Sequence, residues 1–256
     1  MRPSIFLDSG AFSAFTKKIV IDIDEYIAFI KKYEKYLEVY SVLDDINDPD
    51  ITYKNQKYME SKGVNPLPCY HYGEDIKYLK RYLDDDYNYI ALGGMVPIST
   101  GVLKKWLDFL FNNYLTNTKG ISKVKIHGFG LTSIDLMVRY PWFSVDSTSW
   151  VMTGRFGAVY VPVFRTETYD YAKIPHKVAV SNKSPKQKDK GQHYSTFNSI
   201  IQKQIDSYFK LKGYEFKELS EDYKKRDELN IIYFLDLEKN LTDKPFNRST
   251  VKKGFF

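Results

Sequence analysis

The sequence predicts an α/β protein, and within that class a (β/α)8 TIM barrel. Short apolar runs alternate with longer amphipathic stretches from residue 4 to residue 180. Eight of the runs have the composition of strands, and most of the stretches between them have the apolar spacing of helices. Strands and helices that alternate in this way are typical of a parallel sheet with right-handed crossovers, and eight strands fit a barrel. An open doubly wound sheet is the alternative.

The predicted strands are apolar runs bounded by Gly, Pro or Asp, and the predicted helices are amphipathic. In chain order the strands are 4–8, 38–43, 66–70, 89–92, 123–127, 142–146, 158–163 and 177–180. The helices between them are 22–36, 49–62, 73–83, 101–115 and 133–140. Residues 147–157 are too few and too rich in Gly and Thr for a full crossover helix, so we expect the later strands of the barrel to be irregular.

The composition changes after residue 180, and a cationic run without apolar residues begins at residue 182. Such a run is typical of a flexible loop or linker. Beyond it, the residues at 195–212 and 220–238 have the spacing of helices. We therefore predict a catalytic barrel at 1–182, a basic loop or linker at 183–192, and a C-terminal helical segment at 193–256 that completes the barrel or packs on it.

Charge and hydropathy limit the class of protein. The chain has 256 residues and a formal charge of +6, with a pI near 9.0, which permits a polyanionic partner such as nucleic acid. No stretch approaches the roughly 18 apolar residues of a membrane span. The first residues also lack the apolar region of a signal peptide. We expect a soluble, cytoplasmic protein without a membrane partner.

Cysteine and histidine usage predicts no metal centre and no other cofactor. Cys69 is the only cysteine, which excludes an intrachain disulfide and a zinc site built from several thiolates. The four histidines have neither the helical pairing nor the close spacing of a metal site. Cys69 is expected to be a small buried apolar residue.

Polar or glycine residues follow the first six predicted strands. In a barrel, the carboxyl ends of the strands meet at one rim, where reacting groups lie. Taken singly, an Asp at such a place is most often a helix cap or a turn residue. Together these residues predict an active site. In chain order they are Asp8, Asp44, His71, Gly93, Gly94, Gly130 and Asp146.

Four segments, in their order along the chain, resemble the active-site landmarks of the tRNA-guanine transglycosylase superfamily. They are Leu-Asp-Ser-Gly-Ala-Phe at 7–12, Ala-Leu-Gly-Gly at 91–94, His-Gly-Phe-Gly at 127–130 and Val-Asp-Ser at 145–147. In that family an Asp-Ser-Gly-Gly segment carries an acid/base carboxylate, a Gly-Gly pair lies beside the base, and a later Asp is the nucleophile. Arg155 lies nine residues after Asp146 and is followed by Phe-Gly, which matches a further family feature.

The sequence departs from the family at two places. Ala11 replaces the second Gly of the first motif, and the Cys-Cys-Cys-His zinc module that follows the barrel in tRNA-modifying members is absent from the sequence. The compact, zinc-free form is similar to the phage-type DNA-guanine transglycosylases of the DpdA kind, which place 7-deazaguanines in DNA. The resemblance therefore favours DNA over tRNA as the nucleic-acid partner.

The resemblance implies roles for particular residues. Asp146 is the nucleophile that attacks C1′ of the target nucleotide, and Asp8 is the acid and base that exchanges protons with the bases. Asp44 accepts hydrogen bonds from a guanine-like base. Other base-binding candidates are Ser9, Gly10, Phe12, His71, Gly93, Gly94 and Gly130. Candidate phosphate contacts are Arg155, Lys183, Lys186 and Lys188.

The predicted function is exchange of guanine in nucleic acid for a 7-deazaguanine through a covalent Asp–sugar intermediate, which is a pentosyltransferase reaction. Exchange of the same kind on tRNA is one alternative. A non-catalytic nucleic-acid-binding barrel and an N-glycoside hydrolase with the same two carboxylates are the others. A phage-encoded enzyme of this kind would act in the cytoplasm of its bacterial host.

Overall fold

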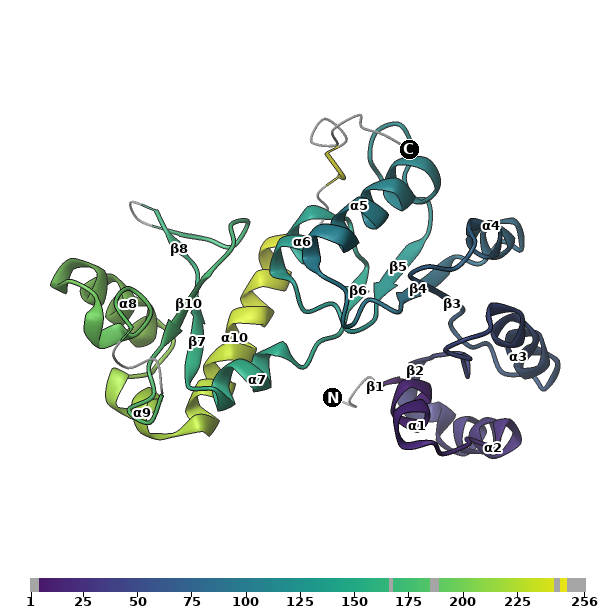
Figure 1. The fold of residues 1–256 in the computed structure, drawn as a ribbon, viewed down its shortest axis with the longest axis horizontal. Helices are drawn as coiled ribbons and strands as arrows, with labels where there is room; N and C mark the ends of the chain where they lie inside the picture. Colours follow the sequence, from purple (N-terminus) through teal and green to yellow (C-terminus); the bar gives the residue numbers. More distant parts are fainter. Residues whose placement is uncertain (1–4, 166–167, 185–188, 242–244, 248–256) are drawn as a thin grey trace. The chain divides into compact units, whose positions relative to one another are not determined.

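The computed structural model describes residues 5–165, 168–184, 189–241 and 245–247, and its elements are labelled in Figure 1. These residues form two compact units. The first unit contains residues 5–131, 141–146 and 245–247, and the second contains the described residues of 132–140 and 147–241. The sequence predicts a division into 1–182, 183–192 and 193–256. The two compact units do not test which segments act together, so this division stays a prediction.

Six parallel strands run through the first unit in sequence order. They are β1 (Ile5–Leu7), β2 (Leu37–Tyr40), β3 (Cys69–His71), β4 (Tyr89–Gly93), β5 (Lys125–Gly128) and β6 (Ser144–Val145). β1 pairs with β2, and β3 to β6 form a four-stranded sheet in the order 3-4-5-6. An isolated parallel bridge between Ser41 and Leu67 links the two sets. The prediction of six parallel strands at these positions is confirmed.

Helices connect these strands. They are α1 (Ala11–Lys17), α2 (Ile23–Tyr33), the 3-10 turn η1 (Glu34–Tyr36), α3 (Pro49–Ser61), α4 (Ile76–Asp84), α5 (Thr100–Leu110) and the π-helical turn η2 (Phe111–Leu115). Asp22, Asp48 and Asp75 cap α2, α3 and α4, each by accepting hydrogen bonds from backbone N–H groups of the first turn. The helices predicted at 22–36, 49–62, 73–83 and 101–115 are confirmed, whereas α1 was not predicted.

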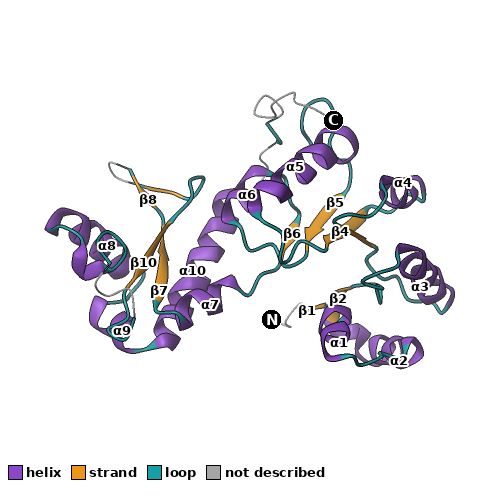
Figure 2. Cartoon of the chain, in the orientation of Figure 1, coloured by secondary structure: helices purple, strands orange, loops and turns teal. Residues whose placement is uncertain are grey.

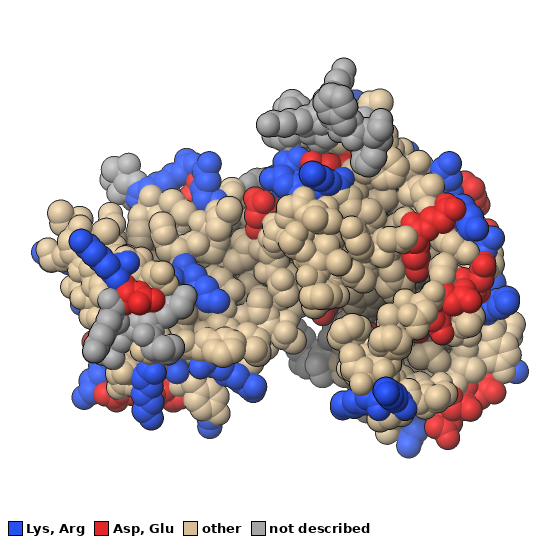
Figure 3. All heavy atoms as spheres, viewed as in Figure 1, with Lys and Arg blue, Asp and Glu red and all other residues tan. Residues whose placement is uncertain are grey.

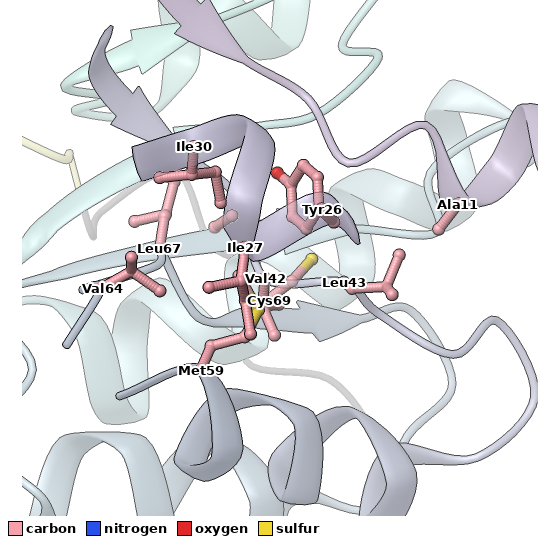
Figure 4. Close-up of a cluster of buried hydrophobic side chains, with 11 residues drawn as sticks. Ala11, Tyr26, Ile27, Ile30, Val42, Leu43, Met59, Val64, Leu67 and Cys69 are labelled. Atoms are coloured by element: carbon pink, nitrogen blue, oxygen red, sulfur yellow. The ribbon is translucent and has the colours of Figure 1, made fainter. Parts of the chain in front are cut away.

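An apolar cluster joins β1 to β4 with the helices α2 and α3. Ile27 and Ile30 of α2 and Met59 of α3 are buried in it. Cys69 of β3 belongs to the same cluster, as Figure 4 shows. The predicted burial of Cys69 is confirmed, since its exposed fraction is 2%. This packing fixes the strand from which Cys69 and His71 project.

The second unit contains the remaining elements. They are α6 (Ile134–Arg139), α7 (Ser149–Arg155), β7 (Ala158–Val161), β8 (Val163–Phe164), β9 (Tyr169–Asp170), β10 (His176–Ala179), the 3-10 turn η4 (Tyr194–Thr196), α8 (Ser199–Leu211), α9 (Phe216–Glu221) and α10 (Tyr223–Leu241). Three predicted helices are present here: 133–140 is α6, 195–212 is η4 with α8, and 220–238 coincides mainly with α10. α7 has only 7 residues, as the composition of 147–157 indicates.

The last two predicted strands, 158–163 and 177–180, do not both run parallel to the first six. They correspond to β7 and β10, which pair with each other in antiparallel orientation (Figure 2). Parallel neighbours need a crossover of a dozen or more residues, usually a helix. Between β7 and β10 the chain instead forms the short antiparallel strands β8 and β9. The prediction that all eight strands run parallel is therefore wrong for this pair.

Side-chain amide and guanidinium groups of α10 hold the second unit together. Asn230 accepts a hydrogen bond from the N–H of Tyr160 and donates to the carbonyl of Trp150. Arg226 donates to the carbonyls of Gly154 and Leu219. Both side chains are buried, so their hydrogen bonds satisfy polar groups that have no access to water.

The protein is thus a mixed α/β protein with parallel strands and C-terminal helices. Among the residues that the structure describes, no helix combines the length and the apolar character needed to cross a bilayer.

Candidate functional site

The predicted site residues of the first unit lie where its parallel strands end. Asp8 follows β1, His71 and Gly93 are the last residues of β3 and β4, and Asp146 follows β6. Asp44 lies in the loop beyond β2. The carboxyl ends of neighbouring parallel strands meet at one edge of a sheet. The fold therefore brings these five residues to the same edge.

Asp8 has the electrostatic surroundings of a general acid. Partial desolvation raises the pKa of the Asp8 carboxyl, and the negative charges of Asp44 and Asp146 raise it further. Hydrogen bonds from the backbone N–H groups of Gly10 and Ser9 act in the opposite direction, but the net shift of the pKa is upward. A carboxyl with a raised pKa keeps its proton closer to neutrality, as an acid catalyst must.

Asp146 is more accessible than Asp44, whose side chain is only 14% exposed. The side chain of Asp146 is 57% exposed. Its Oδ1 accepts a hydrogen bond of 2.9 Å from the N–H of Gly130. Gly130 was predicted to lie against the base, and the structure gives it this contact with the predicted nucleophile.

His127 lies beside Asp146, and the sequence did not predict it as a site residue. Its Nε2 is 3.3 Å from Asp146 Oδ1, without the alignment of a hydrogen bond. Its Nδ1 is 2.7 Å from Ser144 Oγ, which is in turn 2.6 Å from the hydroxyl of Tyr89. The ring stacks on Phe6 with centroids 4.4 Å apart. The imidazole is therefore held in one orientation beside the carboxylate.

Asp44 and His71 form a buried ionic network with Glu74. His71 Nε2 is 2.9 Å from Asp44 Oδ2, and His71 Nδ1 is 2.8 Å from Glu74 Oε1. Burial lowers the pKa of His71, but the neighbouring Cys69 sulfur and the two carboxylates raise it by more, so the net shift is upward. The side chains of Asp44, His71 and Glu74 are 14%, 10% and 11% exposed, so most of this network is shielded from water.

Ser9 positions Asp44. Its Oγ donates to Asp44 Oδ1 at 2.9 Å and accepts a 3.2 Å hydrogen bond from the N–H of Ala11. Its own N–H donates to Ser41 Oγ at 2.7 Å. Ser9 was predicted to bind the base. It is buried, and the contacts described above join it to other residues of the protein.

Gly93 is the place where β4 passes closest to His71. A Cβ at this position would lie 2.7 Å from His71 Cδ2 and 3.0 Å from Cys69 Sγ. These separations are too short for any side chain, so only glycine lets His71 and Cys69 occupy their positions. Gly94, at φ 67°, has the left-handed conformation that glycine adopts most easily. Gly93 and Gly94 therefore leave room for His71, in addition to any contact that they make with a base.

The remaining base-binding candidates lie at the start of α1. Gly10 has a φ of 75° and precedes the helix as its N-cap residue. Phe12, in the first turn, is 56% exposed. Its ring is therefore accessible for stacking on a planar ligand.

The predicted phosphate contacts lie in the second unit. Arg155 ends α7, and its positive charge acts on Asp227, whose pKa burial raises. Lys183 is exposed. Lys186 and Lys188 lie outside the described residues. On the face shown in Figure 3, Lys and Arg occur in small groups among acidic and uncharged side chains.

Three atoms of the kind that bind metals lie together at this edge. They are Asp44 Oδ2, Cys69 Sγ and His71 Nε2, and all lie within 4.8 Å of one another. Histidine spacing alone could not reveal this group. The signal is Cys69-x-His71, because side chains two residues apart on a strand lie on the same face of the sheet. The expectation of no metal centre therefore stays a prediction.

No family model, curated protein or solved structure matches this chain. The resemblance to the guanine transglycosylases thus depends on the motifs at Asp8, Gly93, Gly130, Asp146 and Arg155, and it enters below as a proposal.

Proposed function

We propose that the protein is a guanine transglycosylase, which exchanges guanine in nucleic acid for a 7-deazaguanine. The observation that carries the proposal is the contrast between two carboxyl groups at the same sheet edge. Asp8 has a raised pKa, and Asp146 is exposed and held by the N–H of Gly130. A pair of carboxyl groups, one protonated and one ionised, is what displacement at a glycosidic carbon requires.

In the first step, a carboxylate oxygen of Asp146 attacks C1′ of the target nucleotide. The bond from C1′ to N9 of guanine breaks, its electron pair stays on the base, and the base takes a proton from Asp8. The sugar is then an ester of Asp146. The N–H of Gly130 holds one oxygen of Asp146 and so orients the carboxylate for this attack.

In the second step, the 7-deazaguanine takes the place of guanine at the site. Asp8, now a carboxylate, takes the proton from N9 of the incoming base, and N9 forms a bond with C1′. The ester bond breaks, and its electron pair returns to Asp146. Both carboxyl groups are restored, and no atom is gained or lost apart from the exchanged bases.

Recognition of the base falls to Asp44 and Phe12. Each oxygen of Asp44 has one partner within the protein, Ser9 or His71, and a carboxylate can accept further hydrogen bonds. The N1–H and 2-amino groups of guanine are such donors, and adenine and the pyrimidines do not offer both. Phe12 is accessible for stacking. The target nucleotide must be flipped out of a duplex or met in a single strand.

The proposal includes three finer points. The six parallel β/α segments form the regular part of a barrel whose later strands are irregular. DNA is the favoured nucleic acid, because the motifs are similar to those of the phage-type DNA-guanine transglycosylases. Arg155 and Lys183 contact phosphates, and the reaction takes place in the cytoplasm.

An N-glycoside hydrolase is a second candidate, because the exposure of Asp146 also allows water to attack the sugar ester. One experiment separates the two functions. The protein is incubated with DNA or tRNA and a 7-deazaguanine, and the nucleosides are measured by mass spectrometry. Replacement of guanine supports the transglycosylase, and loss of guanine without replacement supports the hydrolase. Unchanged DNA and tRNA would contradict both.

A further inference from the structure

The group formed by Asp44, Cys69 and His71 has the spacing of ligands around one metal ion. His71 Nε2 is 2.9 Å from Asp44 Oδ2 and 3.5 Å from Cys69 Sγ. In a tetrahedral zinc site the metal lies about 2.0–2.3 Å from each ligand atom, so neighbouring ligand atoms are a little over 3 Å apart. All three atoms lie within 4.8 Å of one another, so they are close enough to share one ion.

Hydrogen bonds among Asp44, Cys69 and His71 cannot satisfy all three side chains at once. Nε2 of His71 carries at most one hydrogen, yet it faces both Asp44 Oδ2 and Cys69 Sγ. If the hydrogen is donated to the carboxylate, the buried thiol has only a weak contact with the ring. An ion that replaces this hydrogen and that of the thiol would contact all three atoms at once.

The residues around the group resemble the outer shell of a metal centre. A histidine that binds a metal almost always donates its other ring N–H to a carboxylate or carbonyl. Here Nδ1 of the His71 ring is 2.8 Å from Glu74 Oε1, and the backbone N–H of His71 donates to Glu74 Oε2. The second oxygen of Asp44 accepts from Ser9 Oγ. Both ligands are thus fixed from outside the group.

The strands provide the group with a rigid frame. Cys69 and His71 are the first and last residues of β3, so they lie on one face of the sheet. Gly93 of the neighbouring strand leaves room for both side chains, because a Cβ there would collide with them. The three ligand residues are therefore positioned by paired strands and by the loop after β2, which favours a preformed site.

We propose that Asp44, Cys69 and His71 form a binding site for one divalent cation of the zinc class. One thiolate, one imidazole and one carboxylate suit Zn²⁺ better than Mg²⁺ or Ca²⁺, which prefer oxygen ligands alone. Three protein ligands leave a fourth position open. On binding, the thiol of Cys69 and Nε2 of His71 lose their protons to solvent, and Glu74 keeps the remaining ring proton on Nδ1.

This inference goes beyond the proposed function, since it depends on none of the steps at Asp146 or Asp8. It also gives Asp44 a second role, because Oδ2 would bind the metal while Oδ1 faces Ser9. The metal-free full chain, without nucleic acid or base, is the material for the test. A failure to bind metal and a failure to exchange bases are therefore separate results.

The test is a titration of the metal-free protein with Co²⁺, followed by absorption spectroscopy. Because Cys69 is the only cysteine of the chain, a thiolate-to-cobalt charge-transfer band reports on this site alone. We expect the band to saturate at one Co²⁺ per chain and to disappear when Zn²⁺ is added. A folded wild-type protein without this band would overturn the proposal.

Variants check the ligand set. Cys69→Ala and His71→Gln should abolish the band, and Glu74→Gln should weaken metal binding by about 10- to 100-fold, as outer-shell changes do. His176→Gln is the matched control, because His176 is exposed in the second unit. Circular dichroism establishes that each variant is folded. A band that persists unchanged in folded His71→Gln would also contradict the proposed site.

Discussion

The two ends of the candidate site use carboxylates in opposite ways. Asp146, after β6, exposes 57% of its side chain, which accepts a hydrogen bond from the N–H of Gly130. Asp44, after β2, exposes only 14% of its side chain and contacts Ser9 through one oxygen and His71 through the other. The same residue type is thus accessible at one end and enclosed at the other.

This difference indicates a division of labour. An exposed carboxylate can approach a substrate carbon, whereas an enclosed one is limited to binding and orientation. Each carboxylate also has a histidine beside it, His127 or His71. We infer that the end near Asp146 is reactive and that the end near Asp44 is a binding site. The following predictions test this comparison.

Asp146→Asn should have the largest effect. Asn has nearly the same size but cannot form the sugar ester, so base exchange should fall by about four orders of magnitude or more. Folding and nucleic-acid binding should persist, as measured by circular dichroism and a mobility-shift assay. The matched control is Asp86→Asn, which should exchange bases normally because Asp86 is exposed and at a positive φ that Asn tolerates. Undiminished exchange by Asp146→Asn would contradict the inference that the end near Asp146 is reactive.

Asp8→Asn should lower exchange by about 10²- to 10⁴-fold, the usual contribution of a positioned acid. In the wild type, the rate should decrease as the pH rises through the raised pKa of Asp8, because the departing base then finds no proton. This alkaline limb should be absent from the pH profile of the variant. If the variant keeps the alkaline limb of the pH profile, that limb reports the titration of a group other than Asp8.

The same substitution should stabilise the fold at neutral pH. A carboxyl whose pKa is higher in the folded state than in the unfolded state makes the fold less stable once the pH exceeds the folded pKa. Asn removes this cost. Thermal unfolding of both proteins below pH 3.8, the ordinary pKa of an Asp carboxyl, and at pH 8 measures it, and we expect the gain to be greater at pH 8.

His127→Leu should have a smaller effect. Its Nε2 lies 3.3 Å from Asp146 Oδ1 without the alignment of a hydrogen bond, so this contact should contribute less than the roughly tenfold in rate, about 1.5 kcal/mol, of a hydrogen bond to a charged group. We expect kcat to fall while KM stays constant, and His127→Gln to recover part of the loss. His127 is then a positioning residue. Equal losses in the Leu and Gln variants would instead indicate that packing against Phe6 is its only role.

Lys183→Ala should have the smallest effect. If this exposed side chain contacts one phosphate, its removal should lower the slope of log affinity against log salt by about one unit. Base preference should not change. Binding curves at several salt concentrations measure the slope, and an unchanged slope would show that Lys183 does not contact the nucleic acid.

Local patterns predicted much of the first unit. The apolar runs at β1 to β6 and the amphipathic helices α2 to α5 were found from periodicity. These signals come from residues close together in the sequence, which is why they could be read without a structure. The placement of Asp8 and Asp146 at strand ends follows from the same patterns.

Other features depend on contacts between distant residues. The antiparallel pairing of β7 with β10 replaces an expected parallel arrangement, and no local signal in either strand specifies the partner. The contact between His127 and Asp146 and the group around His71 arise from packing between neighbouring strands. His127 is buried, and its ring also reaches the predicted nucleophile.

The central claim is that Asp146 carries the sugar during exchange. The protein is mixed with a guanine-containing oligodeoxynucleotide and a 7-deazaguanine, denatured during turnover, digested with trypsin and nuclease, and analysed by mass spectrometry. Cleavage after Arg139 and Arg155 releases a peptide of residues 140–155, in which Asp146 is the only carboxylate side chain. The account predicts a nucleotide-derived mass on this peptide, linked to Asp146. A sugar adduct on any other residue, or exchange without a trapped adduct on this peptide, would contradict it.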